Sequence, residues 1–280
     1  GMMKIGLIDY YLDEWHANNY PKMIEELSKG ACQVSCAYGK IDAPCGARSN
    51  KQWAQDMGIP LLERVEDVIE NGDRLMVLSP DHPEMHEELC ALPLKSGKPT
   101  YVDKTFAPDK GTAERIFAHA EAHGTKCYSS SALRFAQELK TMDQKSICKL
   151  YMEGPGNYDM YAIHQIEPIV ALMNSRARRV MFTGESDQVA MVIQFEDGRY
   201  AQFYQTAVSP FRITVDAGSG AGGGVYPIKS DYFRLFLAEV LRFFQTGHIP
   251  VPWEQTIEVI AIREAGQKAR KAPFQWVSVP

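Results

Sequence analysis

The stretch "KIGLIDYYLDEWHANNYPKMIEELSKG", residues 4–30, decides the fold of the first half of the chain. Residues 4–8 form a short apolar run, which is typical of a buried strand. Apolar residues then recur at helical spacing up to Gly30, so we expect a helix, with Pro21 in its first turn or at its true start. Between strand and helix lie residues 9–16, where carboxylates and aromatic rings replace the glycines of a phosphate-binding turn.

The rest of the first half repeats this order of strand and helix. Strand patterns at residues 33–39, 73–79 and 99–104, the second of them a continuous apolar run, alternate with helical patterns. Strands that are apolar throughout and separated by helices indicate a parallel sheet covered on both faces. The sequence therefore predicts an α/β protein whose N-terminal domain, residues 2–128, contains a Rossmann-like parallel sheet.

Beyond residue 128 the pattern changes. Residues 188–209 alternate between polar and apolar on both sides of Asp197-Gly198, a strong signal for a hairpin. Long amphipathic helices are expected at residues 230–247 and 252–271. We therefore expect residues 129–280 to form an α+β domain with a mostly antiparallel open sheet.

Composition and charge narrow the function. The chain has 280 residues, a formal net charge of −5 and a sequence pI of about 5.8. Nucleic acids and anionic membrane surfaces both need a basic footprint, so we expect neither as a partner. No apolar run reaches the roughly 18 residues that span a bilayer, and the N-terminus shows no signal-peptide pattern. We expect a cytoplasmic protein with a small polar substrate.

Three motifs could suggest a metal or phosphate site, and each has a plainer interpretation. The cysteines form no CxxC pair, so we expect buried thiols rather than zinc at Cys32, Cys36 and Cys45. The histidine pairs four residues apart have no obvious third ligand, and we predict no metal site; they are His82 with His86 and His119 with His123. The run "GSGAGGG" (218–224) lacks the spacing and lysine of a phosphate loop and is expected to connect two strands.

Several segments together resemble, in order along nearly the whole chain, the glucose-fructose oxidoreductase, inositol dehydrogenase and rhizopine catabolism (Gfo/Idh/MocA) family. In that family a strand ends in Glu-Lys-Pro, and this chain reads Asp103-Lys104-Thr105. "SSSALRF" (129–135) resembles the segment that opens the second domain. "YDMYAIHQIEPIVALM" (158–173) resembles the site helix, with His164 in the histidine position. The resemblance implies a Rossmann domain followed by a domain on an open antiparallel sheet.

The resemblance also implies an activity, that of an NAD(P)-dependent oxidoreductase acting on a hydroxyl carbon of a sugar, polyol or related compound. Lys104 would hydrogen-bond the substrate hydroxyl, and His164 would accept its proton. The aspartate that the family commonly carries four residues before the histidine is Met160 here. We therefore expect Glu167, three residues after His164, to orient the imidazole, with Tyr161 as a possible hydroxyl donor.

The cofactor would be NAD or NADP, bound at the ends of the first-domain strands. The residues expected to line it are Asp9, Tyr10, Tyr11, Leu12, Ser79, Pro80, His82 and Asp103.

This expectation conflicts with the residues at the fingerprint positions. A dinucleotide fingerprint requires three glycines, and alignment places Asp9, Tyr11 and Glu14 there. The acids at 9, 13 and 14 can cap the helix themselves, at the place where an anion would bind. A carboxylate about 5 Å from a phosphate charge costs on the order of 3 kcal/mol at an effective dielectric near 20, or about two decades of affinity.

Two functions therefore remain open. The first is an oxidoreductase that binds NAD(P) through an unusual loop. The second is a protein of the same family that has lost the dinucleotide and binds a small ligand as a sensor, accessory subunit or non-redox protein. A third, weaker alternative is a cation held by Asp9, Asp13 and Glu14 in place of the phosphate. By resemblance, we also expect a homodimer or higher homo-oligomer formed through the C-terminal sheet.

Overall fold

The computed structural model describes residues 1–185, 187–218 and 222–280. The chain divides into two compact units: Gly1–Ser130 with Leu237–Trp253, and Ser131–Phe236 with Glu254–Pro280. The first boundary thus lies two residues beyond the expected one. Residues 237–253, which the sequence pattern placed in the second domain, are grouped with the first unit because they pack there. For example, Phe243 contacts Tyr128, with ring centroids 5.0 Å apart.

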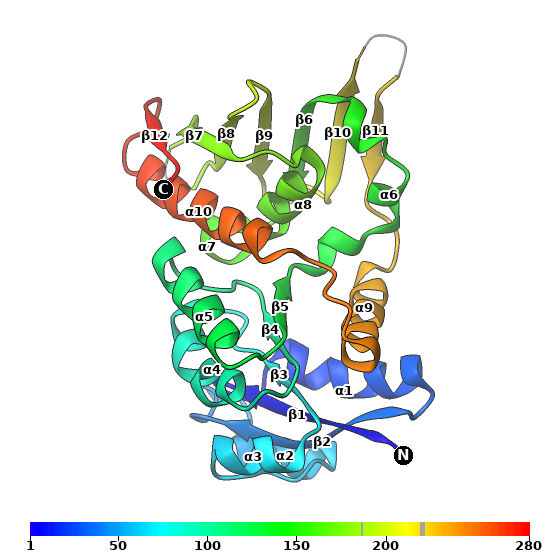
Figure 1. Ribbon diagram of the computed structural model, residues 1–280. Helices are drawn as coiled ribbons and strands as arrows, with labels where there is room; N and C mark the ends of the chain where they lie inside the picture. Colours follow the sequence, from blue (N-terminus) through cyan, green and yellow to red (C-terminus); the bar gives the residue numbers. More distant parts are fainter. Residues whose placement is uncertain (186, 219–221) are drawn as a thin grey trace. The chain divides into compact units, whose positions relative to one another are not determined.

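The first unit is built on a five-stranded parallel sheet with the order β2-β1-β3-β4-β5 (Figure 1). Helices connect the successive strands, as the alternating pattern predicts. The elements are β1 (Met3–Asp9), α1 (Trp15–Ser28), β2 (Cys32–Gly39), α2 (Asn50–Met57), α3 (Val65–Asn71), β3 (Arg74–Val77), α4 (His86–Lys95), β4 (Thr100–Asp103), α5 (Lys110–Ala122) and β5 (Cys127–Ser130).

Apolar burial fixes this sheet. The side chains of β1 from Ile5 to Ile8 and those of β4 are buried, as expected for parallel strands covered on both faces. One expectation was wrong: Pro21 lies inside α1 and not in its first turn, because the helix already begins at Trp15. Its missing N–H removes only one of the bonds that hold a helix of 14 residues.

Parallel strands end at one edge of a sheet, and this brings distant parts of the sequence together. The carboxyl ends of β1, β3 and β4 are neighbours in the sheet order. Asp9 ends β1, Ser79 follows β3, and Asp103 ends β4. The strand-end residues chosen from the sequence therefore lie at one edge of the first unit.

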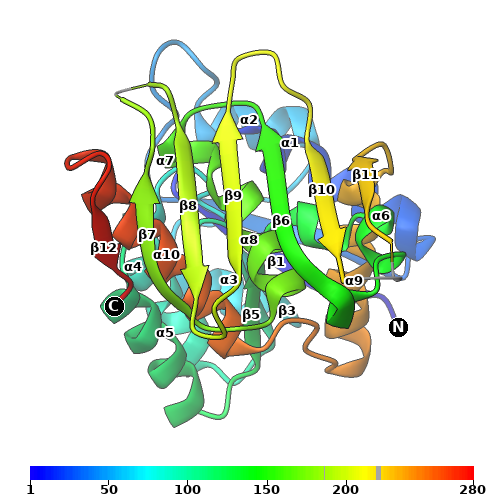
Figure 2. The ribbon, with the colours of Figure 1, turned by 90° about the horizontal axis from the view of Figure 1, so that it is seen from above.

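The second unit is built on a seven-stranded sheet with the order β11-β10-β6-β9-β8-β7-β12 (Figure 2). It is mostly antiparallel, with β6 and β9 paired in parallel. The expected hairpin at Asp197-Gly198 joins β8 to β9. Its strands are β6 (Ile147–Gly154), β7 (Ala177–Phe182), β8 (Ala190–Phe195), β9 (Tyr200–Gln205), β10 (Arg212–Ala217), β11 (Gly224–Pro227) and β12 (Trp276–Ser278).

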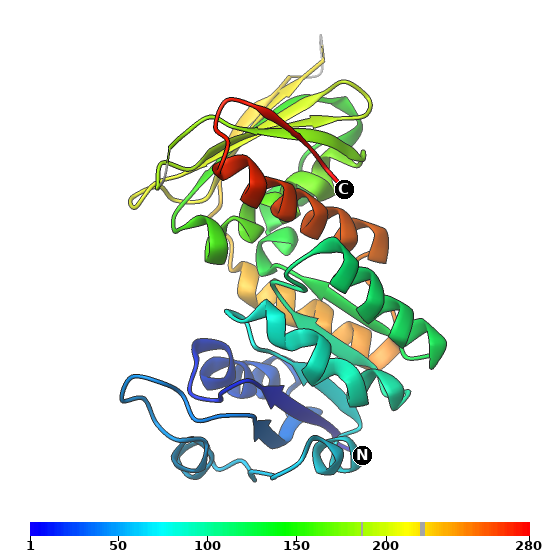
Figure 3. The same cartoon turned by 90° about the vertical axis from the view of Figure 1, so that its left-hand side faces the viewer.

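Helices cover one face of this sheet, as Figures 2 and 3 show. Along β9, side chains alternate strictly between exposed and buried, so the opposite face is open. Residues 219–221 of the glycine-rich run lie outside the described residues, and the run's expected role as a strand connection stays a prediction. The helices of the second unit are α6 (Gln137–Lys140), α7 (Tyr158–Tyr161), α8 (Ile163–Met173) and α10 (Trp253–Arg270). The helix α9 (Tyr232–Thr246) belongs for most of its length to the first unit, which includes Leu237–Trp253.

None of the helices in the described ranges combines the length and apolar character that a membrane span requires.

Candidate functional site

The N-terminus of α1 is capped by the side chain of Glu14. Its Oε1 accepts a hydrogen bond from the Ala17 N–H, and its Oε2 accepts one from the His16 N–H, each at 2.8 Å. The first N–H groups of a helix lack partners within the helix and attract anions. In α1 they bind a carboxylate of the chain itself, and that carboxylate is only 8% exposed.

Asp9, the last residue of β1, is almost completely buried and lies close enough to Glu14 for their charges to interact. Its Oδ1 accepts hydrogen bonds from the Tyr10 N–H at 2.8 Å and the Ser79 N–H at 3.0 Å. Burial raises the pKa of Asp9 well above its ordinary value, and the negative charge of Glu14 raises it further. Asp9 therefore keeps its proton to higher pH than an ordinary aspartate.

His16 supplies the positive charge beside these acids. Its Nδ1 lies 2.8 Å from Glu14 Oε2, and its Nε2 lies 3.9 Å from Asp103 Oδ2. Burial alone would lower the pKa of His16, but the carboxylates of Asp103 and Glu14 outweigh burial and raise it. The pKa of Glu14 is lowered even though burial opposes this, because His16 donates a hydrogen bond to it and carries charge. His16 and Glu14 thus form a buried ion pair.

Asp103, the last residue of β4, lies next to the ion pair of His16 and Glu14. Tyr101 donates its hydroxyl to Asp103 Oδ1 at 2.8 Å. Burial raises the pKa of Asp103, although the positive charges of His16 and Lys104 oppose the shift. Its Oδ2 is buried and has no hydrogen-bond partner among the described residues.

Lys104 follows directly after β4, where the sequence placed it. Its side chain is 10% exposed, and its ammonium lies 3.8 Å from Asp81 Oδ1. That distance is longer than an N–H···O hydrogen bond. The ammonium can therefore donate hydrogen bonds to the hydroxyl oxygen of a ligand.

Aromatic residues surround the same edge of the sheet. His82 packs against the rings of Tyr10 and Tyr11, with centroids 4.9 and 5.7 Å apart, and the Tyr11 hydroxyl is 3.5 Å from His82 Nε2. Pro80, two residues before His82, is buried. Leu12 is completely buried, and its N–H is bound to Asn50 Oδ1 at 3.0 Å. Of the residues expected to meet a cofactor, Leu12 is therefore part of the core.

In the second unit, His164 lies in the first turn of α8. Its Nδ1 is 2.7 Å from the hydroxyl oxygen of Ser131. Glu167 is buried and accepts hydrogen bonds from the Ser131 N–H at 3.2 Å and from Arg134 Nε at 3.1 Å. Arg134 in turn donates to Gln255 Oε1 at 2.7 Å. Glu167 can therefore orient the imidazole through Ser131, a link that the helical spacing alone does not predict.

The neighbouring residues of α7 take different directions. The ring of Tyr161 packs against His164, with centroids 5.4 Å apart, and is 40% exposed. Asp159 accepts a hydrogen bond from Gln267 Nε2 at 2.6 Å and pairs with Arg270, both on α10. Asp159 is thus engaged with α10, which leaves Tyr161 as the α7 side chain beside the histidine.

Solved structures match the chain over its whole length at low sequence identity. A myo-inositol dehydrogenase from Lactobacillus casei in complex with NAD(H) and myo-inositol matches with a TM-score of 0.81 and 13% identity, covering 100% of this chain and 97% of that one. A probable dehydrogenase from Thermotoga maritima gives 0.79 and 13%, with 99% of both chains covered. GenD2 from gentamicin A biosynthesis, in complex with NAD, gives 0.78 and 12%, covering 100% and 97%. The chain has the Gfo/Idh/MocA fold.

The resemblance drawn from the sequence is therefore confirmed for the fold. Comparison with models of protein families gives no match, and comparison with curated proteins gives none either. At 12–16% identity the structural match shows the Gfo/Idh/MocA fold alone and assigns no cofactor or substrate to this chain.

The residues at the N-terminus of α1 do not fit a dinucleotide pyrophosphate. The His16 and Ala17 N–H groups already bind Glu14, and Asp9 places a second carboxyl beside it. After β2, where a Rossmann domain often carries an acid for the ribose, Asp42 Oδ1 is occupied by the Asn50 N–H at 2.8 Å. A phosphate at this position would have to displace a buried carboxylate of the same sign.

Asp13, the third acid between β1 and α1, binds another part of the first unit. Asp13 binds the backbone N–H of Arg48 at 2.9 Å and its guanidinium at 2.8 Å. Among the residues that the structure describes, no group of three or more His, Cys, Asp or Glu side chains is arranged to hold a metal ion. The alternative of a cation on Asp9, Asp13 and Glu14 therefore finds no support.

The histidine pairs also have separate tasks. His86 is buried, with Nδ1 2.8 Å from the Phe106 carbonyl and Nε2 2.5 Å from the Leu78 carbonyl. It thereby ties together the chain beyond β3 and beyond β4. His119 Nε2 lies 2.7 Å from the Ala91 carbonyl.

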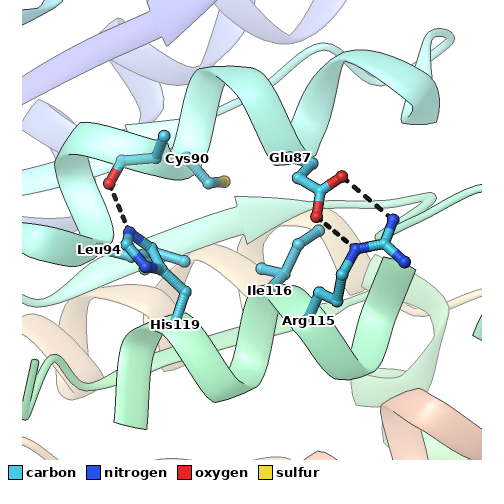
Figure 4. Close-up of a pocket in the computed structure, with 7 residues that line it drawn as sticks. Glu87, Cys90, Leu94, Arg115, Ile116 and His119 are labelled. Carbon is cyan, nitrogen blue, oxygen red and sulfur yellow. Dashed lines mark hydrogen bonds and ion pairs between the residues drawn. The ribbon is translucent and has the colours of Figure 1, made fainter. Parts of the chain in front are cut away.

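The structure also shows a pocket that the sequence does not suggest. It has a volume of about 220 Å³ and lies between α4 and α5 (Figure 4). The Glu87–Arg115 ion pair, at 2.8 Å, lies on one side of it and His119 on the other. Cys90 also lines it, but burial raises the pKa of this thiol well above its ordinary value, so it is a poor nucleophile.

Proposed function

We propose that this protein binds a small polyhydroxylated compound, of the sugar or polyol class, and that Lys104 donates hydrogen bonds to one of its hydroxyls. The observation that carries the proposal is the position of Lys104 at the carboxyl end of β4, where open α/β sheets bind ligands. Its ammonium is nearly buried, and the nearest acid, Asp81, is 3.8 Å away. Among the described residues no acceptor lies within hydrogen-bond distance of this nearly buried ammonium, and a ligand hydroxyl would supply one.

The second unit supports the same class of ligand. The Ser131, Glu167 and Arg134 network holds His164 in one orientation, and an imidazole that can accept or donate a proton suits a hydroxyl group. The sequence predicts both Lys104 and His164 as site residues, and their roles in this chain are part of the proposal.

The test is calorimetric titration with a panel of polyols, inositols and sugars. We expect Lys104→Ala to weaken binding of the preferred compound at least tenfold, because a charged hydrogen bond is worth about 1.5–3 kcal/mol. Lys95→Ala, which removes an exposed lysine in the last turn of α4, is the matched control and should bind as the wild type does. Equal affinity in all three proteins would remove Lys104 from the site, and failure of every compound to bind would contradict the proposal.

A second candidate is an NAD(P)-dependent oxidoreductase that removes a hydride from a hydroxyl carbon of the same compound. It is favoured by the match in fold to dehydrogenases and by the presence of Lys104 and His164 at the family's positions. Titration with NAD(H) and NADP(H), followed by intrinsic tryptophan fluorescence, to which Trp15 contributes, tests whether either cofactor binds. Turnover that His164→Ala abolishes would support this candidate, whereas no binding at millimolar cofactor would exclude it.

We also propose that the chain forms a homodimer or higher homo-oligomer through the open face of the seven-stranded sheet. That face carries the exposed rings of Tyr151, Tyr200 and Tyr204, each about 40% exposed. Aromatic residues are enriched in protein interfaces, which supports a second copy as the partner.

A further inference from the structure

We propose that Glu14 is a built-in anion, which occupies the phosphate position at the N-terminus of α1 and excludes phosphate esters and dinucleotides from it. Removing this one carboxylate should convert the helix end into an anion site. The inference concerns the first unit alone and does not rest on the proposed binding of a polyhydroxylated compound.

The first support is geometric. Both carboxylate oxygens of Glu14 are used at the helix end: Oε1 by the Ala17 N–H, and Oε2 by the N–H and the Nδ1 of His16, all at 2.8 Å. These are the donors and the cation that a phosphate would otherwise recruit. The side chain is 8% exposed, so its place is inside the structure rather than at a solvated surface.

The second support comes from the residue behind Glu14. Asp9 contacts Glu14, is 1% exposed, and has an Oδ2 atom with no hydrogen-bond partner among the described residues. Burial and the charge of Glu14 raise the pKa of Asp9, so Asp9 tends to remain protonated beside Glu14. An incoming phosphate would therefore meet two acids, Glu14 at the helix end and Asp9 at the end of β1.

The third support is charge balance. His16 lies between Glu14, at 2.8 Å, and Asp103, at 3.9 Å. With Glu14 present, the imidazolium is already neutralised. Without it, the His16 and Ala17 N–H groups and His16 Nδ1 would lose their acceptor, and Asp103 would be the remaining carboxylate within 4 Å of the imidazole among the described residues. A variant that lacks the carboxylate should therefore attract an anion and not merely tolerate one.

The experiment measures binding of inorganic pyrophosphate and of NADH by calorimetry to the full chain and to three variants. Glu14→Gly removes the side chain, and glycine is an acceptable N-cap residue. Glu14→Gln keeps the shape of the side chain but removes its charge. Glu25→Gln makes the same charge change on the same helix at an exposed position, and is the matched control.

We expect Glu14→Gly to bind pyrophosphate about a hundredfold more tightly than the wild type does, the factor that one nearby carboxylate costs. The pyrophosphate affinity of Glu14→Gln should lie between those of the wild type and Glu14→Gly, and that of Glu25→Gln should equal that of the wild type. Circular dichroism and thermal unfolding of each variant show whether it folds. If Glu14→Gly is not folded, the comparison of Glu14→Gln with Glu25→Gln carries the test, and equal pyrophosphate affinities in these two would overturn the inference.

Amide NMR shifts locate any ligand that the wild type does bind. If wild-type protein binds NADH while the amide signals of His16 and Ala17 stay unchanged, the cofactor is held elsewhere and the inference stands. If those two amide signals move on addition of NADH or pyrophosphate to the wild type, with affinity equal to that of Glu14→Gly, the helix end is open to anions and the inference fails. Neither result decides whether a polyol binds at Lys104.

Discussion

Asp9 and Asp13 stand four residues apart, and their pKa values shift in opposite directions. Burial, reinforced by the charge of Glu14, raises that of Asp9. Hydrogen bonds from the guanidinium of Arg48, which outweigh partial burial, lower that of Asp13. The two acids therefore affect the stability of the protein with opposite dependence on pH.

The prediction at this scale compares Asp9→Asn with Asp13→Asn. The folded protein holds the proton of Asp9 more tightly than the unfolded chain does, so the wild type loses stability as pH rises from about 4 towards the raised pKa. Asparagine keeps an oxygen for the Tyr10 and Ser79 N–H groups. Relative to the wild type, Asp9→Asn should thus become more stable as pH rises, by on the order of 1 kcal/mol for each unit by which the pKa is raised.

Asp13→Asn should behave in the opposite way. The lowered pKa of Asp13 stabilises the fold above about pH 4 and ceases to do so as pH falls through the lowered value. The variant should therefore be less stable than the wild type at pH 7, by about 1 kcal/mol because Arg48 is partly exposed, and the difference should shrink towards pH 3. Urea unfolding at pH values from 3 to 8 measures the free energy of unfolding of both variants. If the free energy of either variant changes with pH in parallel with that of the wild type, the pKa shift assigned to that aspartate is refuted.

At the scale of elements, β1 packs so closely against α3 that one position admits no side chain. A Cβ on Gly6 would lie 2.5 Å from Val68 Cγ1, 3.2 Å from Leu75 Cδ2 and 3.2 Å from the carbonyl oxygen of Val68. These neighbours belong to α3 and β3, so a side chain at position 6 would require α3 or the Leu75 side chain to shift. The glycine is needed for close approach rather than for its backbone conformation.

Gly6→Ala should therefore destabilise the fold by about 1–3 kcal/mol, the usual cost of overpacking. Gly111→Ala is the control, because its Cβ would meet nothing nearer than 3.7 Å and the residue lies in the first turn of α5. That change should be neutral or stabilise by about 0.5 kcal/mol, since alanine is the better helix former. Chemical unfolding at pH 7 gives both values, and an unchanged midpoint in Gly6→Ala would show that α3 can shift.

At the scale of the whole molecule, the open face of the second sheet carries the testable feature. The inward side chains of β9 are buried, whereas Tyr200 and Tyr204 face outward beside Tyr151 of β6. If this face joins two copies, adding charge should separate them, because a desolvated unpaired charge costs several kcal/mol.

We expect light scattering after size exclusion to show an oligomer for the wild type and a monomer for the double variant Tyr151→Arg with Tyr200→Arg. Leu92→Arg, which places the same charge at an exposed position of α4, should leave the mass unchanged. A monomeric wild type would refute the proposed assembly. An oligomer that survives the double variant would place the interface on another face.

The sequence by itself determined the order of elements and the two kinds of sheet, because burial periodicity is a local property. The runs that became β1 to β4 and the Asp197-Gly198 hairpin can be read from neighbouring residues alone. The sequence also determined that no glycine turn exists and that acids stand in its place. The position of Lys104 at a strand end followed from the same reasoning.

Only the tertiary structure decided what these residues do. It showed that Glu14, among three nearby acids, caps α1, while Asp13 turns to Arg48. It also showed that Ser131, rather than helical spacing, links Glu167 to His164. The contacts of Asp13, Glu167 and His164 are made with residues 33 to 36 positions away in the sequence. The cap at α1 is decided by competition among adjacent acidic side chains for the same N–H donors. Periodicity carries no information about either, because hydrogen bonds are selected by distance and angle in the folded chain.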